Sequence, residues 1–176
     1  MEDADTIRDG GLVTNAQVIS STRTSVVVQA VIADVTVDQA FAAVSDVNRM
    51  GEWSPEGRGR SPVDRPLRAG DRFSGANRRG WRRWSTECVV TRAEAPSAFS
   101  FEVSWAGMPV SRWEYEFEPV EGGALVRETW NDGRRGAQGF LVKMVGLLAS
   151  GVWNRAAHNA KNMTVTLDRL AAALRR

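Results

Sequence analysis

The chain of 176 residues contains one cysteine and one histidine, Cys88 and His158. A single cysteine excludes a disulfide within the chain, and one Cys with one His cannot build a four-ligand zinc cage. We therefore expect no metal or other cofactor. A reducing, cytoplasmic compartment fits this cysteine usage best.

The chain also lacks a long hydrophobic run. Its most apolar stretch, residues 139–153, is interrupted by Lys143, Gly146 and Gly151 and falls short of the roughly 20 apolar residues that a spanning helix needs. The first residues, Met-Glu-Asp-Ala-Asp, are acidic where a secretion signal would be basic and then apolar. These patterns predict neither an integral membrane segment nor secretion.

Charge of one sign does not dominate, because 23 basic and 21 acidic residues leave a formal net charge of +2. Residues 78–84, Arg-Arg-Gly-Trp-Arg-Arg-Trp, have the mixture of arginine and aromatic residues that is typical of nucleic-acid surfaces. If a hairpin turn falls within this segment, however, Arg83 and Trp84 point to opposite faces and the other arginines form a solvated strand edge. The small net charge favours the second interpretation, and no nucleic-acid partner is predicted.

Signatures of common enzymes are missing as well. The chain has no G-x-S-x-G elbow, no G-x-x-x-x-G-K-(S/T) phosphate loop and no G-x-G-x-x-G dinucleotide loop. Any chemistry must therefore come from side chains that the fold gathers into a pocket.

Strand-like runs dominate the chain as far as residue 132. Residues 1–22 have no sustained period and are interpreted as a flexible N-terminal arm, and the β-branched run 25–33 is predicted to be the first strand. Further strands are expected near 57–64, 71–79, 81–93, 98–106, 110–119 and 123–132. Within them, Trp113, Tyr115 and Phe117 alternate with glutamates, which indicates an antiparallel sheet covered on one face only.

Two stretches have helical periodicity. Thr36 and Gln39 form a capping-box pattern that starts a helix over residues 37–47, and a short helical turn follows before Pro55. Residues 156–174 place their apolar side chains three or four positions apart, which predicts a long amphipathic helix over the dry face of the sheet. The fold class predicted is α+β.

Several motifs occur along the chain in the order found in a known superfamily. They are Val37-Asp38-Gln39-Ala40-Phe41, Glu52-Trp53-Ser54-Pro55, Gly70-Asp71-Arg72-Phe73, Trp113-Glu114-Tyr115 and Met163-Thr164-Val165-Thr166-Leu167. Through them the chain resembles the START-like SRPBCC superfamily, and in particular its polyketide cyclase/dehydrase-like branch. The resemblance implies a helix-grip fold, with a curved antiparallel sheet of about seven strands around a long C-terminal helix. It also implies a single domain over residues 23–176.

Members of this superfamily enclose a hydrophobic cavity, but they include carriers, receptors, cyclases and chaperone activators, so the fold does not fix the function. We expect a hydrophobic, lipid-like or polyketide-like molecule to bind between the sheet and the C-terminal helix. The alternative is a polyketide cyclase or dehydratase that acts on such a ligand. A co-chaperone or regulatory module is a third interpretation, and the oligomeric state is left open.

Glu128 is the candidate for acid/base chemistry, because it shares a strand face with Val126 and Trp130. A carboxylate on a dry face needs a partner or a raised pKa; alternatively, a local twist turns Glu128 to solvent or an arginine pairs with it. His158 is expected at a solvated or edge position. The candidate ligand-binding residues are Asn77, Trp84, Phe101, Trp113, Tyr115, Trp130, Met144, Leu148, Asn159 and Met163.

The role of the apolar segment 139–153 has two interpretations. It either packs on the rim of the sheet or forms a lid over the cavity, and the sequence leaves both open.

Overall fold

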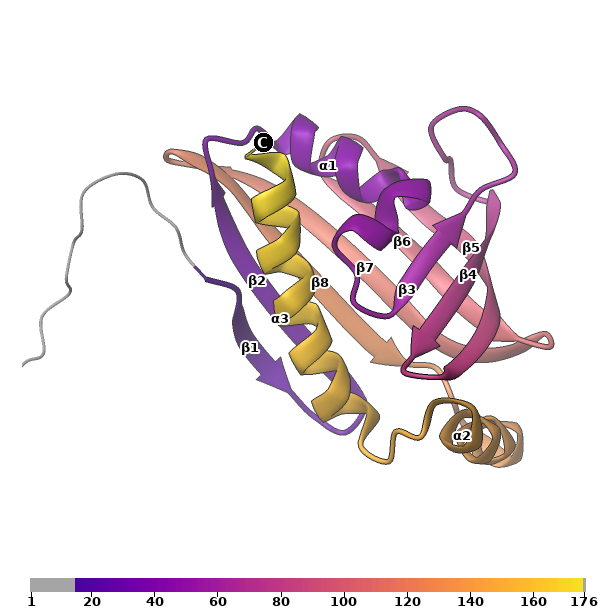
Figure 1. The fold of residues 1–176 in the computed structure, drawn as a ribbon. Helices are drawn as coiled ribbons and strands as arrows, with labels where there is room; N and C mark the ends of the chain where they lie inside the picture. The colour runs from indigo at the N-terminus through magenta and orange to yellow at the C-terminus, as the bar shows by residue number, and fades with distance from the viewer. Residues whose placement is uncertain (1–14, 176) are drawn as a thin grey trace, which may run out of the picture.

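The computed structural model describes residues 15–175, in which one antiparallel sheet bends around a helix (Figure 1). The strands lie in the order β1-β2-β8-β7-β6-β5-β4-β3. Their bounds are β1 Gln17–Ser21, β2 Ser25–Ala33, β3 Gly57–Arg60, β4 Arg72–Arg79, β5 Arg82–Glu94, β6 Ala98–Trp105, β7 Met108–Val120 and β8 Gly123–Asp132. The helices are α1 Val37–Ser45, the 3-10 helix η1 Val47–Glu52, α2 Gly136–Ser150 and α3 Arg155–Leu174. The predicted α+β helix-grip fold is confirmed.

The central strands have one dry face because their side chains alternate in burial. In β2 and in β8 every second residue is buried, and α3 packs on the buried side of both strands. The buried face of α3 consists of Ala156, Asn159, Met163, Thr166, Leu167 and Leu170. Each large apolar side chain buried in this way contributes about 1.5–3 kcal/mol relative to exposure.

The predicted capping box starts α1. The Gln39 backbone N–H donates to Thr36 Oγ1 at 3.2 Å, and the Thr36 N–H donates to the Gln39 side chain at 2.9 Å. The helix ends two residues before the predicted limit, because Asp46 leaves the helical conformation and caps η1 through the Asn48 N–H at 3.2 Å. These short helices lie beside α3 over one end of the concave face (Figure 1).

The sequence interpretation was wrong about residues 17–21, which were assigned to the N-terminal arm and instead form the edge strand β1. All five residues are exposed, so the strand lacks the alternation that would reveal it. Backbone pairing with β2 holds β1, and the Ala16 N–H donates to Asp168 of α3 at 3.0 Å. The sheet therefore has eight strands rather than about seven.

Strand β3 is shorter than the sequence predicted. The strand predicted over 57–64 ends at Arg60, because Ser61 leaves the sheet and its backbone N–H donates to the side chain of Asn48 at 2.9 Å. Residues 1–14 of the expected arm lie outside the described residues.

A short break separates α2 from α3. Gly151, at a φ of 68° that favours glycine, ends α2 with its N–H on the Leu147 carbonyl at 2.7 Å. Asn154 starts α3 by accepting the Ala157 N–H at 3.0 Å. Between residues 15 and 175 no single helix has the length and hydropathy to cross a bilayer; α2 and α3 together meet that test but are bent by 56°. The helix predicted over 156–174 is confirmed as α3.

Candidate functional site

A cavity with about 200 Å³ of free space lies between the concave face of the sheet, α3 and α2. Its lining runs from buried residues such as Trp130 and Met163 to exposed ones such as Arg58 and Trp105, so the cavity reaches from the core to the surface. Protein interiors hold few voids larger than a water molecule, and one water needs only about 10–15 Å³ of such space. The fold thus leaves far more room than imperfect packing would.

Aromatic side chains form the walls of the cavity. Trp84, Phe101, Trp113 and Trp130 come from the successive neighbours β5, β6, β7 and β8. Phe73 of β4 meets Phe101 edge to face, with ring centroids 5.2 Å apart. An apolar ligand would therefore find contact area along the full width of these strands.

The polar centre of the cavity is the pair Glu128 and Tyr115, which lie opposite each other on β8 and β7. The Tyr115 hydroxyl donates a hydrogen bond of 2.7 Å to Glu128 Oε1. Only 2% of Glu128 is exposed, and no arginine among residues 15–175 forms an ion pair with it. Neither alternative raised from the sequence, a turn toward solvent or an arginine partner, is found.

Burial raises the pKa of Glu128 to about 8, because the ionised carboxylate would lose its hydration, and the Tyr115 hydrogen bond offsets this effect only in part. Burial and the neighbouring carboxyl likewise raise the pKa of Tyr115. At neutral pH Glu128 is therefore mainly a neutral carboxylic acid. Its Oε2 atom is buried and has no hydrogen-bond partner within the described part of the chain.

Two asparagines and a thiol add to the lining. Asn77 donates to the Gly75 carbonyl at 3.3 Å and to Thr86 Oγ1 at 3.4 Å, whereas Asn159 reaches the cavity from α3. Burial raises the pKa of Cys88 to about 12, so this residue remains a thiol. No group of three or more His, Cys, Asp or Glu side chains that could hold a metal ion occurs in the segment 15–175.

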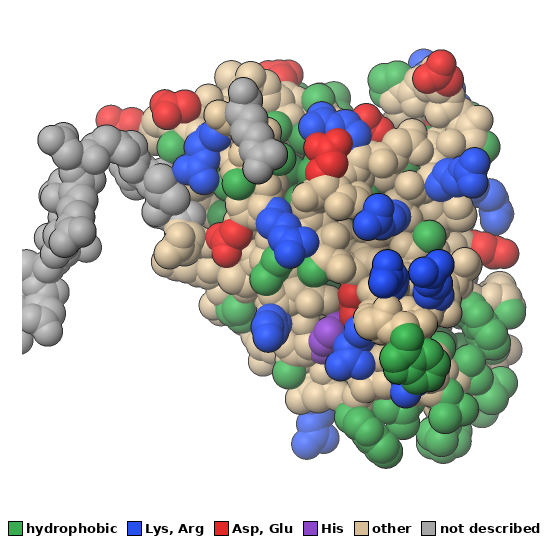
Figure 2. Space-filling model, viewed as in Figure 1, with side chains coloured by type: hydrophobic (Ala, Val, Ile, Leu, Met, Phe, Trp, Pro, Cys, Tyr) green, Lys and Arg blue, Asp and Glu red, His purple; other side chains and the backbone are tan. Residues whose placement is uncertain are grey.

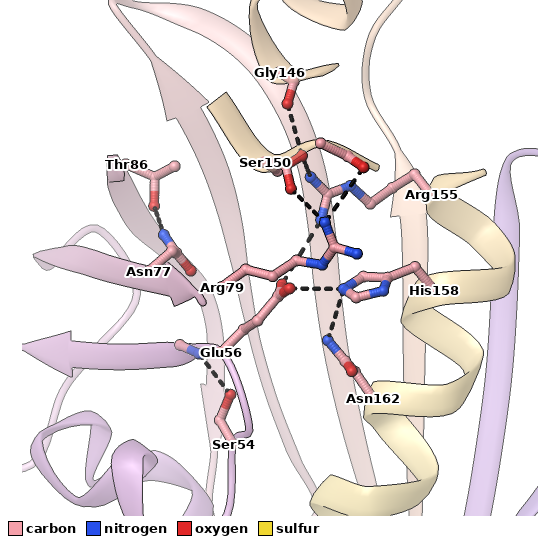
Figure 3. Close-up of polar contacts among 12 residues, drawn as sticks. Ser54, Glu56, Asn77, Arg79, Thr86, Gly146, Ser150, Arg155, His158 and Asn162 are labelled. Atoms are coloured by element: carbon pink, nitrogen blue, oxygen red, sulfur yellow. Dashed lines mark hydrogen bonds and ion pairs between the residues drawn. The ribbon is translucent and has the colours of Figure 1, made fainter. Parts of the chain in front are cut away.

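A polar cluster that links the turn before β3 to α3 forms part of the cavity lining (Figure 3). Glu56 Oε1 lies 2.6 Å from His158 Nε2, and Glu56 Oε2 lies 3.8 Å from Arg155 Nη1. Arg155 also donates to Ser150 Oγ at 2.8 Å. His158 lies at the edge, with its side chain 20% exposed, as expected. Sequence analysis missed Glu56, because it lies in a turn without a motif and 102 positions from His158.

The structure brings most of the predicted site residues to one cavity. Those in the lining are Asn77, Trp84, Phe101, Trp113, Tyr115, Glu128, Trp130, Asn159 and Met163. Met144 and Leu148 were placed wrongly, since they are 46% and 72% exposed on the outer side of α2. The inner side of α2 presents Val142, Val145, Gly146 and Ala149 to the cavity instead.

Most of residues 139–153 lie in α2. Helix α2 packs against β5 and β7 at the rim of the sheet, and its inner side is also a wall of the cavity. The segment thus combines the packing role with the position of a lid. That α2 acts as a lid stays one of the two interpretations of the sequence.

A bent antiparallel sheet that grips a C-terminal helix, with an aromatic-walled cavity between them, defines a helix-grip protein. The family described as "Polyketide cyclase / dehydrase and lipid transport" matches residues 23–175, and the chain belongs to this family. The SRPBCC resemblance seen in the sequence is therefore confirmed. No curated protein matches the chain.

Solved structures share the fold. One is a protein from Rhodobacter sphaeroides, with 17% identity and a TM-score of 0.60 over 91% of this chain and 97% of that chain. Another is the Polyketide_cyc-like protein Cgl2372 from Corynebacterium glutamicum, with 25% identity and a TM-score of 0.50 over 86% of this chain and 89% of that chain. DynU16, from the dynemicin biosynthetic locus, has 16% identity and a TM-score of 0.59; the match covers 86% of this chain and 47% of DynU16.

Proposed function

We propose that this protein binds an apolar, lipid-like or polyketide-like molecule that presents a hydrogen-bond acceptor to Glu128. The observation that carries the proposal is the unpartnered Oε2 of a neutral, buried Glu128 in the lining of the cavity. A buried polar atom without a partner costs about 1–3 kcal/mol, which a bound carbonyl or hydroxyl oxygen would recover. Because Oε1 accepts from Tyr115, the acid proton belongs on Oε2, where it is free to be donated.

Two matched probes test this donor. 1-Tetralone and tetralin are bicyclic molecules of similar size that differ in one carbonyl group. Below the pKa of Glu128, we expect the parent protein to bind 1-tetralone about tenfold more tightly than tetralin, because one net hydrogen bond is worth about 1–1.5 kcal/mol. Isothermal titration calorimetry measures both affinities.

Two variants of Glu128 distinguish the effect of its hydrogen-bond donor from the effect of its side-chain volume. Glu128→Leu removes the donor, so it should lose the preference for 1-tetralone or favour tetralin, because the ketone oxygen would be buried without a partner; Glu128→Gln retains an N–H donor and the preference. In the parent protein the preference should disappear as the pH rises through about 8, since a carboxylate cannot donate. Equal binding of both probes by the parent protein, or an unchanged preference in Glu128→Leu, would contradict the proposal. If the parent protein shows the preference, native mass spectrometry of protein purified from its own host would identify the natural ligand.

A second candidate function is cyclisation or dehydration of a polyketide-like ligand, and the raised pKa of Glu128 favours it. A neutral acid could protonate a carbonyl or leaving hydroxyl oxygen of the substrate. Binding ranks first because such a reaction also needs a base, and the neighbouring Cys88 and Tyr115 keep their protons at neutral pH. Loss of water from a poly-β-ketone thioester, detected by mass spectrometry and abolished in Glu128→Gln without loss of binding, would establish the enzyme.

A further inference from the structure

Helix α2 is apolar on two opposite sides, and only one of them is covered. Its inner side lines the cavity. On its outer side Phe140, Leu141, Met144 and Leu148 are 67%, 53%, 46% and 72% exposed. At about 100° per residue these four side chains fall within an arc of about 100°, so they form one continuous apolar strip along the helix.

Two tryptophans extend this strip beyond the end of α2. Trp153 follows the helix and is 88% exposed, and Trp81, at the β4–β5 turn, is 83% exposed. Arg82 joins the turn to the helix, since its guanidinium donates to the Leu148 carbonyl and lies 4.7 Å from the centre of the Trp81 ring. We call these six side chains the α2 surface; Figure 2 shows exposed hydrophobic side chains gathered in this region of the molecule, at the lower right.

The two chain segments that carry the α2 surface have charges of one sign. Segments 78–86 and 133–154 contain no Asp or Glu, and the acid just before the second segment, Asp132, is paired with Arg134 at 2.8 Å. The basic residues of the two segments are Arg78, Arg79, Arg82, Arg83, Arg134, Arg135 and Lys143. The net charge of +2 thus conceals a local excess of positive charge beside the apolar strip.

We propose that the α2 surface docks on an anionic lipid bilayer. A strip of Phe, Leu and Met flanked by exposed indole rings and basic residues matches a bilayer interface, where apolar side chains enter the acyl boundary and cations meet anionic headgroups. A second copy of the chain suits the surface less well, because a twofold contact would bring the basic residues of both copies together. An acidic protein partner is the remaining occupant that the experiment must separate from a bilayer.

Docking through α2 would place the cavity close to the bilayer. Because the inner side of α2 is a cavity wall, the bilayer would lie next to the same helix that bounds the ligand site. The docking proposal itself rests only on the outer side of α2 and does not depend on the proposed ligand.

Vesicle flotation with the full chain tests the proposal. We expect the protein to float with vesicles of phosphatidylcholine mixed with phosphatidylglycerol and not with vesicles of phosphatidylcholine alone, and added salt should weaken the association. No binding to the anionic vesicles would overturn the proposal and leave a protein as the partner of this surface.

Matched variants locate the binding surface. Replacing Phe140 and Leu148 together with Ser should weaken vesicle binding at least about tenfold, because both apolar side chains would leave the bilayer. The control replaces Val18 and Ile19 of β1 with Ser; these are 47% and 51% exposed on the edge strand and should have no effect. Equal weakening by the control pair would overturn the placement on α2.

Variants of the two lysines of the chain test the role of charge in vesicle binding. Lys143→Glu should weaken binding to anionic vesicles about fivefold or more, whereas Lys161→Glu, on the exposed side of α3, should change it much less. Unchanged circular dichroism and an unchanged midpoint of urea unfolding in every variant would show that the fold is intact. Sedimentation that reveals a dimer lost in the Phe140 and Leu148 variant would overturn the proposal in favour of contact between copies.

Discussion

Glu128 should make the stability of this protein depend on pH with a sign opposite to that of most carboxyl groups. Its pKa in the folded protein is about 8, against an ordinary value of 4.5. Below about pH 4.5 the carboxyl is neutral in both states and its contribution to stability is fully present. As the pH rises further, the unfolded state ionises first, so the free energy of unfolding falls by about 1.4 kcal/mol per pH unit until the pH passes about 8.

The variant Glu128→Gln isolates this effect, because glutamine has nearly the same shape as the neutral acid and does not ionise. The difference in unfolding free energy between Glu128→Gln and the parent protein should be smallest near pH 4.5. As the pH rises, the variant should become increasingly more stable than the parent protein. The difference should reach the order of 5 kcal/mol near pH 8, from a pKa difference of about 3.5 units at about 1.4 kcal/mol each. Urea denaturation followed by tryptophan fluorescence, repeated across this pH range, measures the difference.

Subtracting the parent curve from the variant curve removes the titration of every other group. Glu102→Gln, the same substitution at an exposed position on β6, is the matched control. Tyr115→Phe should extend the decline to higher pH, because the tyrosine hydrogen bond holds the pKa of Glu128 down. A constant difference between Glu128→Gln and the parent protein would refute the reasoning, since it would mean that Glu128 ionises alike in both states.

Three further outcomes follow from the packing. Trp130→Ala should cost about 3–5 kcal/mol of stability in urea and should weaken binding of both tetralin and 1-tetralone by about 1–3 kcal/mol; unchanged affinity in the folded variant would place the ligand elsewhere. Thr36→Ala should lose about 1 kcal/mol of unfolding free energy, because the capping box opens, whereas Thr36→Ser should lose little; equal stability of the two variants would contradict this role. Cys88 should resist a thiol-reactive dye in the native protein and react after unfolding in urea, since burial holds its pKa at about 12; rapid native labelling would show that the cavity admits the reagent.

The sequence predicted the central strands and the place of Glu128 for the same physical reason. Alternation in a half-buried strand fixes which side chains share a face, so Glu128 could be assigned to the dry side together with Val126 and Trp130. Strand β1 escaped prediction because all of its residues are exposed and only backbone hydrogen bonds define it. Backbone hydrogen bonds alone do not require any pattern of apolar and polar residues that a sequence could reveal.

The outer part of the site was predicted less well. Helix α2 is apolar on both sides, so its periodicity could not tell which side meets the cavity, and Met144 and Leu148 were chosen from the exposed one. The hydrogen bond between Glu56 and His158 depends on how the turn before β3 meets α3. Contacts of that kind arise only once the tertiary structure is in place.

The strand order also sets the sequence of events during synthesis. From β3 to β8, each strand pairs with the next one along the chain, so these hairpins can form as the chain leaves the ribosome. Strand β2, made earlier, pairs with β8, which follows after about 90 further residues, or roughly 5 to 20 seconds at ordinary translation rates. The apolar side chains of Val26, Val28 and Ile32 are covered later still, because α3, which packs on their side of β2, is made after β8. Strand β2 is therefore the segment of the nascent chain that chaperones should bind first.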